Sequence, residues 1–408
     1  MSKITLNSVT NDAFIVNDAG DAQRAEIIQA GRILTYEHAI KGHNAMNAAA
    51  GRAGNGMTGM DDTAYREMNA KFQNDMLVYA AGRACVMTGA NAPKTLDEFR
   101  QQSLKWYGNA NLYAVLSDIF TEIVTPILPA VISDAVSLFA DTVYVDFGQT
   151  YEITVGSNDI PVFQDSAWGA SRSVPRNRFY DKSYVVNPTA RTCQINGKWT
   201  QLVANGTDFG RYFANIAAGL YAKIMGMWNA AMTAAASNTA LIPSGLTYNF
   251  SNNNWVTLAN KISAVNNTPF GNVFAFGGAL ALSKVLPTEA TGSTNTAMDA
   301  ALAELLGAEY TRSGYMGEFM GVTLRPLTDA VVPGTQNTTV TTMLDQTKIW
   351  LMAGNGRKPM TIGMMNGTPI EIEVDPTKAG DMEMAYNVTT ALDAVSVFSS
   401  KIGLINIA

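Results

Sequence analysis

The longest helical pattern in this chain runs from Asp208 to Ser237. Apolar side chains recur there at intervals of three and four residues, as on one face of an α-helix: Phe209, Tyr212, Phe213, Ile216, Leu220, Tyr221, Ile224, Met227, Trp228, Ala231 and Ala235. The segment has no proline, and Thr207 and Asp208 supply side-chain oxygens for its first free amides. A helix of this length spans roughly 40–45 Å, which exceeds a compact domain of ordinary size. We therefore predict a spine helix that other elements or other subunits must cover.

The first hundred residues show two further helical patterns, joined by a glycine-rich break. Residues 1 to about 20 are polar and aperiodic, which is typical of an arm. Helical periodicity then covers Asp21–Ala50 and Thr63–Met87, on either side of the flexible stretch Gly51–Asp62. These patterns predict an extended helical arm that could not fold by itself.

Strand periodicity begins at Thr142. The residues alternate from there, and the polar stretch 156–198 ends in strands that we expect to be arranged around an Asn196-Gly197 turn. A two-stranded ribbon is marginal in water, so we expect this segment to lie on a neighbouring molecule.

The C-terminal part of the chain mixes short helices and strands, with no internal repeat. The patterns predict helices at Asn254–Val265, Gly278–Leu286 and Thr296–Gly307, and strands at Asn272–Phe276, Gly321–Leu327, Thr347–Ala353, Thr361–Met365, Ile370–Val374, Met382–Val397 and Lys401–Ala408. This order predicts an α/β region that is followed by a final β segment.

The composition changes this picture in one respect. Of 408 residues, 47% are apolar but only 15% are charged, well below the usual quarter. An ordinary apolar fraction with few charges favours a protein that hides much of its surface against copies of itself. The net charge of −6 and a pI near 5.1 argue against broad binding to nucleic acid or anionic membranes.

No membrane span or secretion signal is expected. The segment 96–140 predicts helix and turn, interrupted at Pro126 and Pro129. Its most apolar part, Ile119–Ala140, also contains Glu122 and Asp134, and a lipid-spanning helix would not readily carry these charges and prolines. The first residues lack the apolar core of a signal peptide, so we expect a soluble protein made in the cytosol.

Two cysteines, Cys85 and Cys193, cannot form a disulfide framework, although one bridge between them stays possible. The only histidines, His38 and His43, lie five residues apart and so on different faces of a helix, where a metal pair would need a spacing of four. We read both histidines as solvated helix residues.

Other motifs also favour structural explanations. Gly54, Gly56 and Gly59 spell GxGxxG, but no buried strand precedes them, so a hinge between helices is the better interpretation. The carboxylate pairs sit at strand spacing on one face, which favours solvated or inter-subunit positions over acid–base catalysis; the pairs are Glu371 with Glu373 and Asp381 with Glu383. We predict no catalytic, cofactor-binding or metal-binding residues.

One basic cluster is interleaved with aromatic side chains. Arginines beside aromatic rings can stack on nucleic acid, but they are also the usual anchors of protein interfaces, and the acidic total favours an interface. We predict that these residues contact other subunits: Trp168, Arg172, Arg176, Arg178, Phe179 and Tyr180, with Lys182 completing the basic cluster.

The order of these elements resembles the major capsid protein of tailed bacteriophages, with its Hong Kong 97-type α+β fold. The order is a helical arm, a long polar β-ribbon, a spine helix, a mixed α/β region and returning strands. The resemblance implies an N-terminal arm over 1–100, an extended loop within 145–205 and the spine at 208–237, the last two forming the first part of a peripheral domain (101–240). An axial domain would cover 241–345, and return strands of the peripheral domain would cover 346–408.

The resemblance implies assembly into an icosahedral virion shell around double-stranded DNA, made in the host bacterial cytoplasm. The partners it implies are the chain itself in hexamers and pentamers, scaffolding, portal and decoration proteins, and packaged DNA in non-specific contact with an acidic inner wall. It implies no cofactor and no membrane partner. Three alternatives stay open: an encapsulin-like nanocompartment shell, a tail or baseplate component, and an α/β enzyme that uses carboxylates.

Overall fold

The computed structural model describes residues 22–49, 62–89, 91–137, 139–146, 148–156, 181–237, 242–286, 313–354, 358–365, 370–374, 382–397 and 401–407. Its helices are α1 (Ala22–Ala49), α2 (Asp62–Thr88), α3 (Leu96–Gln101), α4 (Ser103–Trp106), α5 (Ala110–Val136), α6 (Trp199–Val203), α7 (Phe209–Ala236), α8 (Asn252–Val265) and α9 (Ala279–Ser283). Its strands are β1 (Ala140–Val145), β2 (Tyr151–Val155), β3 (Lys182–Val186), β4 (Thr189–Lys198), β5 (Thr247–Asn249), β6 (Val273–Gly278), β7 (Glu318–Phe319), β8 (Val322–Leu327), β9 (Lys348–Ala353), β10 (Met360–Met365), β11 (Ile370–Val374), β12 (Glu383–Ser396) and β13 (Gly403–Asn406).

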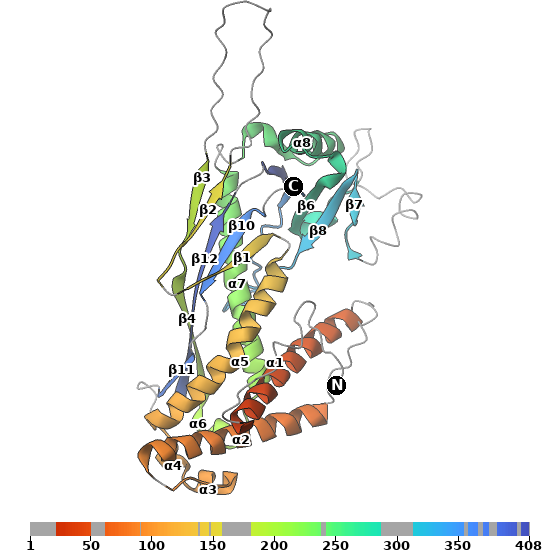
Figure 1. The fold of residues 1–408 in the computed structure, drawn as a ribbon. Helices are drawn as coiled ribbons and strands as arrows, with labels where there is room; N and C mark the ends of the chain where they lie inside the picture. Colours follow the sequence, from red (N-terminus) through yellow and green to blue (C-terminus); the bar gives the residue numbers. More distant parts are fainter. Residues whose placement is uncertain are drawn as a thin grey trace, which may run out of the picture.

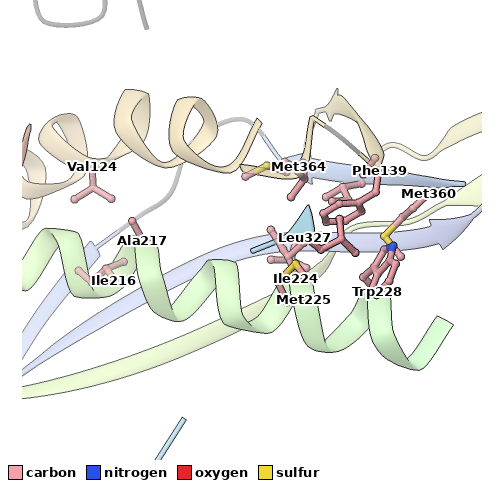
Figure 2. Packing of buried hydrophobic residues seen from close by; sticks show 14 of the residues in the cluster. Val124, Phe139, Ile216, Ala217, Ile224, Met225, Trp228, Leu327, Met360 and Met364 are labelled. Atoms are coloured by element: carbon pink, nitrogen blue, oxygen red, sulfur yellow. The ribbon is translucent and has the colours of Figure 1, made fainter. Parts of the chain in front are cut away.

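The predicted spine is the 28-residue helix α7, which runs from near α6 toward α8 (Figure 1). Asp208 caps it, because its carboxylate accepts a hydrogen bond from the Arg211 amide at 3.1 Å. One face of the helix is buried against α5 and the strands, as Figure 2 shows for Ile224 and Trp228. The Trp228 ring lies 5.4 Å from that of Phe139, centroid to centroid. The spine is thus one side of the core.

Helices α1 and α2 pack onto the same core and do not project away from it, as an extended arm was expected to do. Ile28 and Leu34 of α1 and Met76 of α2 are fully buried. Arg24 of α1 also reaches α5, where it forms ion pairs of 2.6 Å with Asp118 and 2.7 Å with Glu122. Each of these two helices therefore buries an apolar face against the core, a face that would be exposed to water if the helix stood alone.

Helix α5 continues through Pro126 and Pro129, which corrects the predicted interruption. A proline at 126 leaves the carbonyl of Glu122 without its usual backbone donor. Arg32 of α1 supplies the missing hydrogen bond, with its Nη2 2.8 Å from that oxygen. The donor comes from 90 residues away in the chain, and local sequence rules cannot anticipate it.

The start of α7 is held by α2. Tyr65 donates a hydrogen bond of 2.6 Å to the capping carboxylate of Asp208, and Asn69 and Gln73 both donate to the carbonyl of Thr207. Gly210 allows this approach, since a Cβ there would lie 2.6 Å from the Leu34 carbonyl oxygen of α1. Three helices therefore meet at the first turn of the spine.

The first sheet is organised around the 14-residue strand β12. One edge of β12 pairs with β4, and the other pairs with β11 and β10, beyond which lies β1. Strand β4 runs straight through Asn196 and Gly197, so the predicted turn there is wrong. A Cβ on Gly197 would lie 2.9 Å from the Tyr386 ring, so the glycine serves close packing.

The second sheet has the order β5-β13-β9-β6-β8-β7. Helix α8 covers it through Trp255, Leu258 and Ile262, which are fully buried. A loop after β8 is anchored by Asp329, whose Oδ1 accepts from the amides of Ala330, Met343 and Leu344 and whose Oδ2 accepts from Gln346 at 2.6 Å. The hydroxyl of Tyr221 on α7 donates to the Thr328 carbonyl at 2.7 Å and ties this loop to the spine.

The predicted α+β class is confirmed, and the helices and strands expected after residue 250 lie within a few residues of the observed ones where the structure describes them. The helix expected at 296–307 lies outside the described residues.

Candidate assembly surfaces

The residues predicted to contact other subunits all fall within 157–180, which lies outside the described residues; they are Trp168, Arg172, Arg176, Arg178, Phe179 and Tyr180. Lys182, the last member of the basic cluster, is exposed at the start of β3 and pairs with Val155 at the end of β2. The stretch that carries the six residues therefore connects the paired ends of the two ribbon strands.

The base of the β2–β3 ribbon packs on its own chain, which corrects the expectation that the whole ribbon lies on a neighbour. Ile153, Val155 and Val186 form a small separate cluster with Val397, which follows β12. These four side chains are at most 8% exposed. The apolar face of the ribbon is thus covered by the residue that follows β12 in the same chain.

The opposite face of the ribbon is open. Val185 is 54% exposed, and Glu152 and Thr154 beside it are exposed as well. Ser183 donates a hydrogen bond to the Glu152 carboxylate across the two strands. This face mixes polar groups with an exposed valine and can receive another surface.

Strand β4 is the most exposed long strand that the structure describes. Eight of its ten residues are exposed, and only Ile195 and Gly197 are partly covered. It pairs with β12 on one side, and no other strand among the described residues pairs with it. The sequence carried part of this signal, since six of the ten residues in TARTCQINGK are polar, but the Asn196-Gly197 pair led to the prediction of a turn instead.

Most of the residues considered for catalysis or cofactor binding lie outside the described part of the chain. Glu383 is partly buried on β12, whereas Asp381 and the side chains of Glu371 and Glu373 lie outside the described residues. His38 is partly buried on α1. The side chain of His43 and the three glycines Gly54, Gly56 and Gly59 also lie outside the described part of the structure.

The two cysteines are both free thiols. Cys85 is buried on α2, and its sulfur lies 3.4 Å from the carbonyl oxygen of Asn91. Cys193 is exposed on β4. The bridge that the sequence left possible is not formed in this structure.

Several tyrosines in or beside the core have a raised pKa. Burial raises the pKa of both Tyr113 and Tyr221 to about 12. Among carboxyl groups, burial raises the pKa of Asp75; partial burial opposes ionisation of Asp345, but hydrogen bonds from Lys348 and Thr347 lower its pKa overall. These groups sit on separate elements, and their neighbours account for each shift without a catalytic role.

The described residues form neither a metal cluster nor a membrane-spanning helix. There, no three side chains of His, Cys, Asp or Glu converge as metal ligands. None of the helices in that part of the chain combines the length and apolar character that a membrane crossing requires.

A known protein family matches most of the chain. The family described as "SPbeta prophage-derived putative capsid protein YonB" matches residues 84–406. No curated protein matches the chain.

Among solved structures, the capsid of the Cyanophage P-SCSP1u is similar at 8% identity and a TM-score of 0.40, over 66% of this chain and 86% of that one. The capsid of the native GTA particle has 14% identity and a TM-score of 0.40, over 68% of this chain and 90% of that one. The virus-like particle from Pyrococcus furiosus has 12% identity and a TM-score of 0.34, over 70% of this chain and 98% of that one. These scores lie below 0.5, so the family match is the stronger finding.

Proposed function

This chain belongs to the YonB family of phage-type capsid proteins, and on that premise we propose that it builds the closed icosahedral shell of a tailed phage or prophage around double-stranded DNA. The match over residues 84–406 carries this conclusion, because it spans the spine helix and both sheets. The protein is a structural component of a virion capsid and not an enzyme.

The subunit would join its copies through different surfaces on its two sides. Heterologous contacts of this kind close into rings, which here would be hexamers and pentamers. The open ribbon face around Val185 and the exposed strand β4 support this arrangement, since both leave groups uncovered in the single chain. The segment 157–180, with its arginines and aromatic residues, would extend the contact onto a neighbour.

The domain division of a Hong Kong 97-type subunit is part of the proposal. Residues 1–100 would be the N-terminal arm, whose helices α1 and α2 pack back onto the core. Residues 101–240 would be the first part of the peripheral domain, 241–345 the axial domain, and 346–408 the returning strands. The packing of α7 against both α5 and β12 supports a spine for the peripheral domain. Scaffolding, portal and decoration proteins would be further partners, and packaged DNA would touch the shell without sequence preference.

Electron microscopy of the purified full-length chain tests the proposal. The chain should form closed polyhedral shells when it is expressed alone or with proteins of its own phage. Tubes or small rings would contradict the shell and favour a tail or baseplate component. Shells that close around a protein cargo and never around DNA would favour a nanocompartment.

A further inference from the structure

The exposed edge of β4 is longer than either edge strand of the second sheet. The second sheet ends in β5 and β7, which have only three and two residues. Such short strands offer little to an incoming chain, which is one way in which proteins protect a sheet edge. Strand β4 has ten residues and contains no proline. At about 3.3 Å per residue it presents an edge of roughly 30 Å.

The register shows which peptide groups of β4 point outward. In antiparallel strands, hydrogen-bonded pairs alternate with non-bonded pairs. The amide of Trp199 donates to the carbonyl of Met382 at 2.9 Å, so the odd-numbered residues of β4 face β12. The even-numbered residues then direct their N–H and C=O groups away from the sheet: Ala190, Thr192, Gln194 and Asn196. Within the described residues, no backbone group donates to or accepts from these outward groups.

The charges on β4 indicate what could pair with it. The strand carries Arg191 and Lys198 and no acidic residue, whereas the whole chain has a net charge of −6. A second copy of this acidic chain is therefore complementary to the edge, but a second β4 would repel it. Nucleic acid could meet the two basic side chains, yet it lacks the alternating donors and acceptors of a peptide strand.

We propose that the outward edge of β4 hydrogen-bonds to an extended segment, other than β4, of a second copy of this chain. The proposal rests on the shell function and adds the acceptor surface to it. Because the donor segment differs from β4, the contact is heterologous, as ring closure requires. Four residues of β4 supply both a donor and an acceptor at intervals that match an added strand.

Proline at position 194 tests the proposal, with alanine at the same position as the matched control. Gln194→Pro removes an N–H that points away from β12, a place where edge strands tolerate proline. Gln194→Ala shortens the same side chain and keeps the N–H. We expect both variants to fold, with matching circular dichroism, and the yield of shells to fall at least tenfold for Gln194→Pro alone. Shells from Gln194→Pro at the yield of the control would overturn the proposal.

Hydrogen exchange on the unmodified protein decides the matter if Gln194→Pro fails to fold. Peptides that cover residues 190–196 should exchange at least tenfold more slowly in shells than in unassembled subunits. Equal exchange in the two states would overturn the proposal while leaving the shell function intact. A complete absence of shells would instead refute the proposed function, and this inference with it.

A photocrosslinking residue at position 194 identifies the segment that pairs with the edge of β4. Shells assembled from mixed heavy-isotope and ordinary chains should give crosslinked peptides that join the two labels, with the partner peptide outside β4. Crosslinks from β4 to β4, to nucleic acid or only to another protein would each contradict the stated occupant.

Discussion

Substitution of Gly210 by alanine should loosen the junction of three helices at the start of the spine. A Cβ at this position would lie 2.6 Å from the carbonyl oxygen of Leu34 and closer still to the hydroxyl of Tyr65. The Leu34 oxygen belongs to the backbone of α1, so it cannot move without the helix. Tyr65 could turn away, but it would then give up its hydrogen bond to the capping carboxylate of Asp208.

The size of the effect follows from these two costs. Overpacking of a filled site costs about 1–3 kcal/mol. Loss of a hydrogen bond to a charged acceptor costs about 1.5–3 kcal/mol. Relaxation at one of the two contacts should relieve the other in part, so we expect Gly210→Ala to destabilise the subunit by about 2–4 kcal/mol.

The matched control is Gly219→Ala, on the same helix. A Cβ on Gly219 would meet no atom within 4 Å. Alanine there should stabilise the helix by up to about 1 kcal/mol, because it is the better helix former. Urea unfolding of unassembled subunits, followed by circular dichroism, measures both variants. If Gly210→Ala is as stable as Gly219→Ala, the close packing of α1 and α2 on the spine does not exist.

Three other predictions follow from contacts in the core. Arg32→Met should lower the free energy of unfolding, measured in urea, by about 1–3 kcal/mol. The loss should be smaller in a Pro126→Ala background, where the amide of residue 126 can donate to the Glu122 carbonyl, and equal losses in the two backgrounds would refute this. Asp329→Asn should cost about 1–3 kcal/mol and speed hydrogen exchange of the loop amides that the carboxylate binds, and unchanged exchange would contradict its role as an anchor. Burial raises the pKa of Tyr221 to about 12 from 10.0, so the stability it contributes is complete below pH 10 and is lost as the pH rises toward 12. Tyr221→Phe should therefore show a smaller alkaline fall in its unfolding midpoint, and an identical fall would be evidence against this linkage.

Periodicity alone was enough to predict the main elements of the fold. The spine helix and the strands after residue 250 depend on apolar residues that repeat within one element, and these patterns are visible locally. The errors arose where residues distant in the sequence determine the local secondary structure. Pro126 is tolerated within a helix because Arg32 donates a hydrogen bond to the carbonyl of Glu122, which the proline leaves without a backbone donor. Gly197 lies within a strand, where the ring of Tyr386 packs against it too closely for a side chain.

The two candidate assembly surfaces differ in how far the sequence indicates them. A basic and aromatic cluster indicated an interface at residues 168–180, and the structure does not describe that stretch. The edge of β4 was missed, since an unpaired edge is a property of the sheet order and not of the strand itself. The capsid family, by contrast, was predicted from the order of elements and agrees with the match over residues 84–406.

Sedimentation velocity of the freshly purified full-length chain tests most directly whether it needs its own copies. We predict that the chain sediments as large closed particles, with a minor fraction of small oligomers that converts to particles as the concentration rises. A single species with the sedimentation of a compact monomer, unchanged across concentration and in the presence of proteins from its own phage, would contradict the account.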